Sequence, residues 1–593
     1  MELKLKRIAF LLLVIVAIFP FCSAEEAETM MVSTNQAVYR PGSQVVCAME
    51  NLPADSADLR FSLLHVDDIV LVKTFNAENE SFSFDLPDKD YVGYLLVVDA
   101  LNSRGEIIET TMTGIDCSSS WTKFPRYGYL WDYRAITDTT EKIEELCHYH
   151  INGLQFYDWQ YRHHIPVSPN PEKWEDWSGR TIYGKTIRNY LNDAHQKRMV
   201  CLAYNMIYAA NQTYLTDGSG VNASWRLLKG NGQDFTIDMD ARRGPVGILQ
   251  YFNPLNPDWQ KYIFAREKEV FSVFDFDGWH GDTIGEMGIM KTAVGEPLGV
   301  DESGNPIHYV KDTYTQFLNA AKKAIGDKYL VFNPVGAQGI EHVNVSNADV
   351  LYTEFWPWDN DDRGLPYADY YSIHRAILQA NEQSGGKPLI VAAYINYKNP
   401  ASYFNAPAVL LMDCMVFASG GSRIELGNGD GMLSNEYFPD DRNKKMDQDL
   451  KAAVQRIYDF AVAYENLLRD GQKPVERIVR IDEIPVSNNG KKDTIWVFSK
   501  ADDRNEIYHF INLIGTDSDW RDTEQTKKVP VYQKDLKVRI YTDFPATKIC
   551  LTSPDTDDLT VHSLPFEKGK DEKGAYLTFT LPGLAYWNMV FLR

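Results

Sequence analysis

The sequence lacks the residue patterns that most often bind metals or act as nucleophiles. Only seven cysteines occur among 593 residues, and none forms a CxxC pair, which argues against zinc ribbons and thioredoxin-like chemistry. Neither an HExxH motif nor a GxSxG motif is present. The HxH triplet at 148–150 falls in a predicted helix, where its two histidines face apart. We therefore expect neither a metal nor a cofactor.

Long apolar runs are also missing, except at the N-terminus. There, Lys4, Lys6 and Arg7 precede an apolar stretch from Ile8 to Ile18, and small residues follow up to Ala24. This pattern predicts a signal peptide over 1–24, and hence a protein exported to the periplasm, the medium or the outer surface. Cleavage just before Cys22 would instead leave a lipid anchor, although the "FPF" ahead of it is a poor lipobox.

The charge of the chain is one-sided, because 82 acidic residues face 60 basic ones, a formal net charge of −22. An acidic surface repels nucleic acid and anionic lipid, so we expect neither as a partner. Aromatic residues make up 13% of the chain, including 13 Trp and 34 Tyr. Aromatic planes stack on the C–H faces of sugars, but large cores and β domains also use them. Both interpretations stay open on composition alone.

Both ends of the chain have β-strand patterning. Residues 25–117 alternate apolar and polar side chains in short runs such as "SQVVCAME" and "SFSFDL", with turn signals between them. This predicts an immunoglobulin-like β-sandwich over 25–117. Clean alternation returns after about residue 480, as in "DTIWVFSK" and "LKVRIYTDF", and predicts an antiparallel β-sandwich over 481–593.

Residues 118–480 have a different pattern, in which β-rich apolar runs alternate with amphipathic helical stretches. The eight β-rich runs are 127–133, 153–159, 198–206, 276–285, 329–336, 349–358, 388–396 and 421–427. Helical spacing occurs between most of them, but the connection over 337–348 is too short for a full helix. Eight such repeats predict a (β/α)8 barrel. We expect the long segment 207–255 to form an elaborated loop over the barrel mouth.

Acidic residues recur at the ends of the predicted barrel strands, where the reactive residues of such barrels lie. They are Asp132, Asp158, Asp282, Glu354 and Glu425. Tryptophan and histidine gather at the same ends, as Trp131, Trp159, Trp279, His280, Trp356 and Trp358. Buried acids are costly unless they are paired or functional. A ring of acids and indoles fits the cleavage of a neutral polysaccharide, for which two carboxyl groups suffice.

Four segments resemble the motifs of glycoside hydrolase family 66. They are "GLQFYDWQYRHH", "YFNPLNPDWQKY", "FDGWHGDTIGE" and "DVLYTEFWPW", and the similarity covers roughly residues 30–590. That family contains endo-dextranases and cycloisomaltooligosaccharide glucanotransferases, which act on α-1,6-glucan with retention of configuration.

The resemblance implies roles for particular residues. Asp282 would be the nucleophile, Glu354 the acid/base, and Asp158 would hold hydroxyls of the sugar in the reacting subsite. The aromatic residues at the strand ends would add to substrate binding; these are Trp159, Trp279, His280, Trp356 and Trp358. Dextran and isomaltooligosaccharides are the implied partners.

Two enzyme activities and one binding function remain open at this point. The transferases typically carry an additional carbohydrate-binding module in the barrel region. Here the later strands are closely spaced and the segment 207–255 is too short for a module, which favours an endo-dextranase. A non-catalytic glucan-binding surface protein is the third alternative, but it would have no reason to keep both Asp282 and Glu354.

Overall fold

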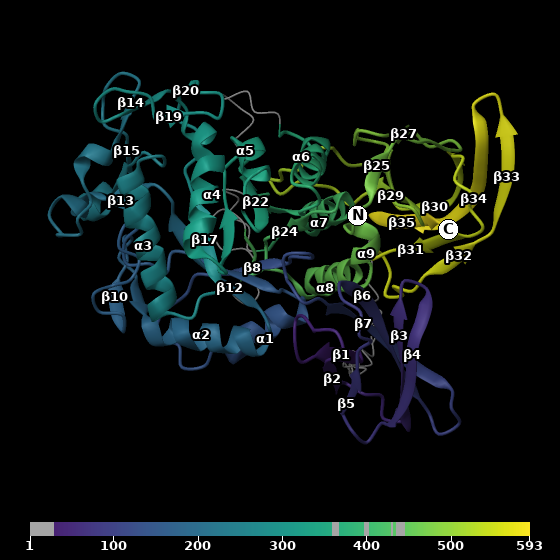
Figure 1. Cartoon of the computed structure of the whole chain (residues 1–593). Helices are drawn as coiled ribbons and strands as arrows, with labels where there is room; N and C mark the ends of the chain where they lie inside the picture. The colour runs from purple at the N-terminus through teal and green to yellow at the C-terminus, as the bar shows by residue number, and fades with distance from the viewer. Residues whose placement is uncertain (1–28, 358–366, 396–402, 428–430, 434–444) are drawn as a thin grey trace, which may run out of the picture.

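The computed structural model describes residues 29–357, 367–395, 403–427, 431–433 and 445–593 (Figure 1). The predicted signal peptide and Trp358 lie outside these residues. Within them, no helix combines the length and the hydropathy needed to cross a membrane. The six cysteines of the described part are all buried and form no disulfide there.

Two antiparallel sheets at the N-terminal end share one hydrophobic core. The first has the order β1 (Met31–Thr34), β2 (Gln44–Glu50), β5 (Ser81–Asp85), and the second β4 (Asp68–Asn76), β3 (Asp58–His65), β6 (Val92–Leu101), β7 (Ile107–Cys117). Strand β2 buries every second side chain, as the sequence alternation requires. The arrangement is consistent with the predicted sandwich; its immunoglobulin-like topology stays a prediction.

The central region contains an eight-stranded parallel sheet, as the sequence pattern predicts. In chain order the strands are β8 (Tyr127–Leu130), β9 (Gly153–Phe156), β12 (Val200–Met206), β17 (Gly278–Asp282), β21 (Tyr329–Phe332), β22 (Val350–Phe355), β23 (Leu389–Ala393) and β24 (Ser422–Arg423). Neighbours in sequence are neighbours in the sheet. The N–H of Tyr129 donates to the carbonyl of Leu426 at 3.0 Å, which connects the first strand to the segment after the eighth. The sheet thus curves into a nearly closed barrel.

Helices surround this sheet on its outer side (Figure 1). They are α1 (Thr140–His148), α2 (Gly184–Gln196), α3 (Pro257–Val273), α4 (Tyr314–Ile325), α5 (Ile340–Asn344), α6 (Tyr370–Gln383), α7 (Ala406–Ser419), α8 (Gln448–Ala463) and the short α9 (Glu465–Leu468). Local sequence explains several starts: Asn256 caps α3 ahead of Pro257, and Asp369 forms a capping box with Ser372 at α6. The connection predicted to be too short for a full helix holds the five-residue α5.

Several short elements decorate the barrel between these strands and helices. A hairpin of β10 (Lys173–Glu175) and β11 (Thr181–Tyr183) lies between β9 and α2. The segment after β12 builds a small sheet of β13 (Ala209–Asn211), β16 (Ile248–Tyr251) and β15 (Thr236–Asp238), with the 3-10 turns η1 (Gln212–Leu215), η2 (Ala223–Trp225) and η3 (Ala241–Val246). Two further pairs are β14 (Leu227–Lys229) with β18 (Met290–Thr292), and β19 (Gly299–Val300) with β20 (Pro306–Ile307), ahead of η4 (Val310–Thr313).

The C-terminal region consists of two antiparallel sheets that share a core. One has the order β25 (Lys473–Val475), β28 (Ile495–Ala501), β29 (Glu506–Asn512), β35 (Trp587–Leu592), β31 (Ile549–Thr552), β32 (His562–Leu564), with β27 (Val486–Ser487) also paired to β28. The other has the order β26 (Ile478–Ile481), β30 (Gln533–Tyr541), β34 (Gly574–Leu584), β33 (Phe566–Asp571). Strand pairing therefore starts this region at β25, earlier than the predicted boundary at 481. Lys500 donates to the carbonyl of Ala418 at the end of α7, so the region packs on the barrel's helices.

Candidate active site

Two carboxylates predicted from the motifs lie at the carboxyl ends of barrel strands. Asp282 is the last residue of β17, and Glu354 is the fifth residue of the six-residue β22. Strand β21 separates these two strands in the sheet. Each residue is 9% exposed, so both carboxylates are largely removed from water but not sealed from it.

Asp282 accepts hydrogen bonds from two neighbouring strands. The hydroxyl of Tyr204, in β12, donates to Oδ2 at 2.6 Å, and the amide of Asn333, just after β21, donates to Oδ1 at 2.9 Å. Donors on both oxygens fix the carboxylate in the barrel mouth and favour its ionised form. This is the form that a nucleophile requires.

Glu354 also accepts a hydrogen bond on each of its carboxylate oxygens. The hydroxyl of Tyr394 donates to Oε1 at 2.9 Å, and the indole N–H of Trp356 donates to Oε2 at 3.0 Å. The Trp356 ring stacks on Tyr394 with 3.7 Å between ring centroids and 9° between planes. Trp356 therefore supports Glu354 through a polar contact.

The two carboxylates influence each other's ionisation. Burial raises the pKa of Asp282 well above its ordinary value, and the negative charge of Glu354 raises it further. The hydrogen bonds from Tyr204 and Asn333 act in the opposite direction. Two buried like charges near each other are costly, so the doubly ionised state of the pair is disfavoured. One acid and one base in the same mouth is the arrangement that glycoside cleavage needs.

Asp158 follows the end of β9 and is 2% exposed. Its carboxylate accepts from the indole of Trp177 at 2.9 Å and from Gln160 at 3.3 Å, and lies 3.6 Å from the Arg180 guanidinium. Burial raises the pKa of Asp158 to about 6, against the effect of Arg180. Its backbone φ of 47° is unusual for a residue other than glycine. A sugar hydroxyl would have to replace one of these partners, and the role of Asp158 in substrate binding stays a prediction.

Tyr204 links Asp158 to the catalytic candidates. Burial raises the pKa of Tyr204 far above its ordinary value, and the charges of Asp282 and Asp158 raise it further. Its hydroxyl therefore stays protonated and remains a donor. The charges of Asp158 and Asp282 thus both act on Tyr204 at the mouth of the barrel.

Two predicted sugar-binding tryptophans are instead core residues. Trp159 and Trp279 are both 0% exposed. Trp159 packs against Phe274 and Phe276, and Trp279 packs against Phe317 of α4. Both rings lie between the barrel strands and the helices, so neither offers a face to a sugar. This contradicts their predicted role in substrate binding.

His280 is likewise enclosed, in this case inside the barrel. It is 1% exposed, stacks on Tyr127 and accepts from or donates to the Tyr127 hydroxyl at 3.0 Å through Nδ1. Burial lowers the pKa of His280 to about 3, so it is neutral at physiological pH. Its ring also packs against Tyr204, and its burial leaves no face for a ligand, which contradicts the prediction of substrate binding.

The other acids at the strand ends and in the segment around β17 have structural contacts. Asp132 accepts two hydrogen bonds from the side chain of Arg134 and one from its backbone N–H, and Glu425 forms a fully buried ion pair with Arg423 at 2.9 Å. Glu286 accepts the backbone N–H of Gly288 and of Lys311. Asp277 lies directly before β17 and accepts from His195 at 2.9 Å.

One group of potential metal ligands occurs in the described chain, namely His195, Cys201 and Asp277. It lies at the amino ends of β12 and β17, the opposite end of the barrel from Asp282. Asp277 Oδ2 already bridges His195 and the backbone N–H of Cys201. These contacts account for the cluster as a link between the end of α2 and the barrel.

Three residues that orient the carboxylates were not predicted: Tyr204, Asn333 and Tyr394. Each lies in the carboxyl-terminal half of a predicted strand, in the runs "RMVCLAYNM", "YLVFNPVG" and "PLIVAAYIN". A search of strand ends for hydrogen-bond donors, in addition to acids, would have found them.

A parallel barrel with a buried carboxylate pair at the carboxyl ends of its strands is an arrangement typical of glycoside hydrolases. The sequence profile of glycosyl hydrolase family 66 matches residues 34–591, and the chain belongs to that family.

Relatives within the family have two different activities. A cycloisomaltooligosaccharide glucanotransferase of Niallia circulans is 26% identical over 723 aligned residues, which cover 95% of this chain and 72% of the relative. A dextranase of Streptococcus salivarius is 27% identical, with 84% of this chain and 67% of the relative covered. A crystal structure of a cycloisomaltooligosaccharide glucanotransferase of Paenibacillus sp. with cycloisomaltoheptaose superposes with a TM-score of 0.83 at 25% identity, covering 95% of this chain and 99% of that chain.

Proposed function

We propose that this protein is an exported, retaining endo-dextranase that hydrolyses α-1,6-glucosidic bonds of dextran to isomaltooligosaccharides. The observation that carries the proposal is the pair of Asp282 and Glu354, which lie at the ends of two barrel strands and close enough for the charge of Glu354 to raise the pKa of Asp282. Membership of a family of dextran-acting enzymes supplies the substrate class. Release of reducing ends from dextran tests the activity directly, and a non-catalytic glucan binder would release none.

The proposed cycle has two displacements. Glu354, protonated, gives its proton to the glycosidic oxygen while Asp282, ionised, attacks C1 and forms a β-linked glycosyl-enzyme. Glu354 then takes a proton from water, the water oxygen attacks C1, and Asp282 leaves. The product has the α configuration of the substrate. The hydrogen bonds from Tyr204 and Asn333 stabilise Asp282 both before attack and after release.

The lengths of the matches to the two kinds of relative favour hydrolysis over cyclisation as the activity of this protein. The match to the Niallia circulans transferase spans 723 residues and the match to the Streptococcus salivarius dextranase 585, each more than the part of this chain that it covers, so both relatives have inserted residues and the transferase has more of them. A transferase must hold a long acceptor chain near the intermediate, and added binding surface serves that purpose. Cyclisation by the same intermediate is the alternative, and cyclic products would establish it.

Replacing Tyr204 by Phe is expected to lower kcat/KM on dextran by roughly 10- to 100-fold, because a hydrogen bond to a charged group contributes about 1.5 to 3 kcal/mol. In the unaltered protein the hydrogen bond from Tyr204 lowers the pKa of Asp282. Removing the Tyr204 hydroxyl therefore raises the pKa of Asp282. The acid limb of the pH profile should therefore move to higher pH. Tyr251→Phe is the matched control, since this buried hydroxyl donates to the sulfur of Met206 at 3.9 Å and, among the described residues, makes no hydrogen bond to Asp282. An unchanged acid limb in Tyr204→Phe would count against Asp282 as the ionised group.

Glu354→Gln should remove the alkaline limb of the pH profile while the acid limb stays in place. Glutamine resembles the protonated Glu354, so Asp282 keeps the neighbour that it has in the active form. Glutamine cannot lose a proton at alkaline pH, so the step that causes the alkaline limb is removed. The measurement is kcat/KM against pH with an aryl α-isomaltoside whose leaving group needs no proton. A surviving alkaline limb would assign that limb to a group other than Glu354.

A further inference from the structure

A cavity of about 720 Å³ lies beside the candidate active site, at the end of β8. Two short segments line it: residues 131–136, which follow β8, and residues 180–183, which are Arg180 and the strand β11. The N–H of Tyr183 donates to the carbonyl of Tyr133 at 2.9 Å and connects the two walls. The volume falls within the range of roughly 300 to 1,000 Å³ that is usual for ligand pockets.

Arg180 connects this cavity to Asp158. Its side chain lines the cavity, while its guanidinium donates to the carbonyl of Asp158 at 3.0 Å and lies 3.6 Å from the carboxylate. A second pair of contacts, to Asp176 at 2.8 Å and 2.6 Å, fixes the guanidinium in place. The cavity is therefore one side chain away from the residue expected at the reacting sugar.

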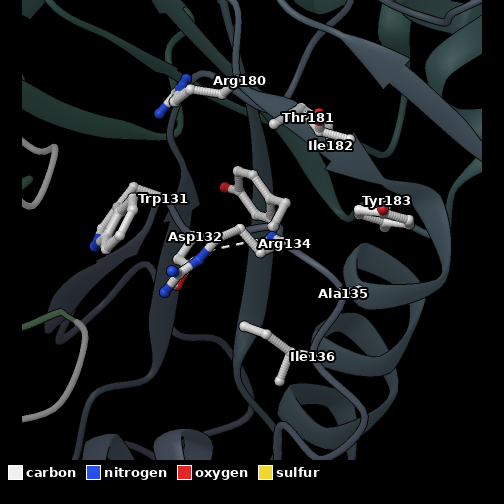
Figure 2. A pocket seen from close by; sticks show the side chains of 10 residues that line it. Trp131, Asp132, Arg134, Ala135, Ile136, Arg180, Thr181, Ile182 and Tyr183 are labelled. Carbon is white, nitrogen blue, oxygen red and sulfur yellow. Dashed lines mark hydrogen bonds and ion pairs between the residues drawn. The ribbon is translucent and has the colours of Figure 1, made fainter.

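The lining combines aromatic rings with fixed polar groups. Trp131 and Tyr183 are partly exposed, and Figure 2 shows them on opposite sides of the cavity, with Arg180 at its upper edge and Ile136 at its lower edge. Asp132 and Arg134 lie between the two rings and are joined by hydrogen bonds of 2.9 Å and 2.7 Å (Figure 2). Flat rings for C–H faces and preset donors and acceptors for hydroxyls suit a sugar.

The charges of the lining are balanced. Asp132 is paired with Arg134, and Arg180 is paired with Asp176. The Arg134 hydrogen bonds outweigh burial and keep the pKa of Asp132 below its ordinary value, so both members of that pair are charged. A phosphate or carboxylate ligand would need an uncompensated cation. The cavity therefore suits a neutral, hydroxyl-rich ligand.

We propose that this cavity is a glucan subsite, which holds glucosyl units of the same α-1,6-linked chain that is cleaved at Asp282 and Glu354. The proposal rests on the proposed function for the identity of the sugar. Trp131 and Tyr183 stack on the sugar rings, and the Asp132–Arg134 pair and Arg180 bind hydroxyls. The chain passes from the cavity along Arg180 to Asp158 and the carboxylate pair.

The test compares Trp131→Ala and Tyr183→Ala with Tyr532→Ala, a control that removes an exposed tyrosine ahead of β30. Each cavity variant should raise KM for dextran about tenfold and leave kcat within twofold, because such a contact is made equally in ground state and transition state. The ratio of the KM of each cavity variant to the KM of the unaltered protein should decline as the isomaltooligosaccharide substrate becomes shorter. Unchanged KM for dextran in both cavity variants would overturn the proposal.

A binding measurement separates this proposal from the proposed function. Calorimetry with linear isomaltoheptaose is made on Asp282→Asn, with and without Trp131→Ala. If the unaltered protein cleaves dextran and the Trp131 substitution leaves binding unchanged, the subsite fails and the function stands. If the protein does not cleave dextran but binds isomaltoheptaose at least tenfold more tightly with Trp131 than without it, the function fails and the subsite stands. Absence of both cleavage and binding would remove both.

Discussion

Asp282→Asn should abolish dextran cleavage, lowering kcat by roughly 10⁴-fold or more, because a nucleophile stabilises the transition state by covalent bonding that an amide cannot supply. The fold should be unaffected. Asparagine keeps the volume of the side chain, and its carbonyl oxygen still accepts one of the bonds from Tyr204 and Asn333. Reducing-sugar release and far-ultraviolet circular dichroism measure the two quantities separately.

Glu286→Gln is the matched control for this loss, since it removes a carboxylate four residues away in the same segment. The Glu286 carboxylate accepts backbone N–H groups of the loop and contacts neither Asp282 nor Glu354 by hydrogen bond. We expect its kcat to remain within about tenfold of the unaltered protein. Residual activity of Asp282→Asn above one per cent would remove Asp282 from the role of nucleophile.

Azide should restore turnover of an activated aryl α-isomaltoside to Glu354→Ala, by at least about 100-fold. The activated leaving group departs without a proton, so the glycosyl-enzyme still forms on Asp282. Azide then occupies the space vacated by Glu354, attacks C1 from the α face and needs no base. The product should be the α-glycosyl azide, which nuclear magnetic resonance identifies by the coupling of its anomeric proton.

The same experiment with Asp282→Ala should give the opposite anomer. Here azide occupies the space of the missing nucleophile and displaces the leaving group directly from the β face, which yields the β-glycosyl azide. If the two variants gave these azides in exchanged positions, the roles of Asp282 and Glu354 would be reversed.

The parallel strands were predictable because they are buried on both faces, and their apolar runs stand out against the amphipathic helices between them. The same property hides which side chains point inward. In β17 the alternation counted back from Asp282 places His280 inside the barrel and Trp279 outside, against the helices. Counting from the carboxylate would have excluded Trp279 from the site, whereas proximity in sequence alone included it.

The surroundings of Asp158 could not be read from the sequence for another reason. Its partners Trp177 and Arg180 come from the segment around the β10–β11 hairpin, and the apolar pattern of the chain does not reveal that this hairpin folds over the end of β9. Arg162, the nearest arginine in sequence, instead donates to the carbonyls of Tyr161 and Glu175. The left-handed backbone of Asp158 adds a local turn that only tertiary contacts hold.

The most direct test of the central claim is proton nuclear magnetic resonance of dextran during the first minutes of incubation with the protein, followed by separation of the products. Retaining endo-hydrolysis predicts that the α-anomer of new reducing ends appears first, and that the products are linear isomaltooligosaccharides of several lengths. The β-anomer appearing first, predominantly cyclic products, or dextran that stays intact would contradict it.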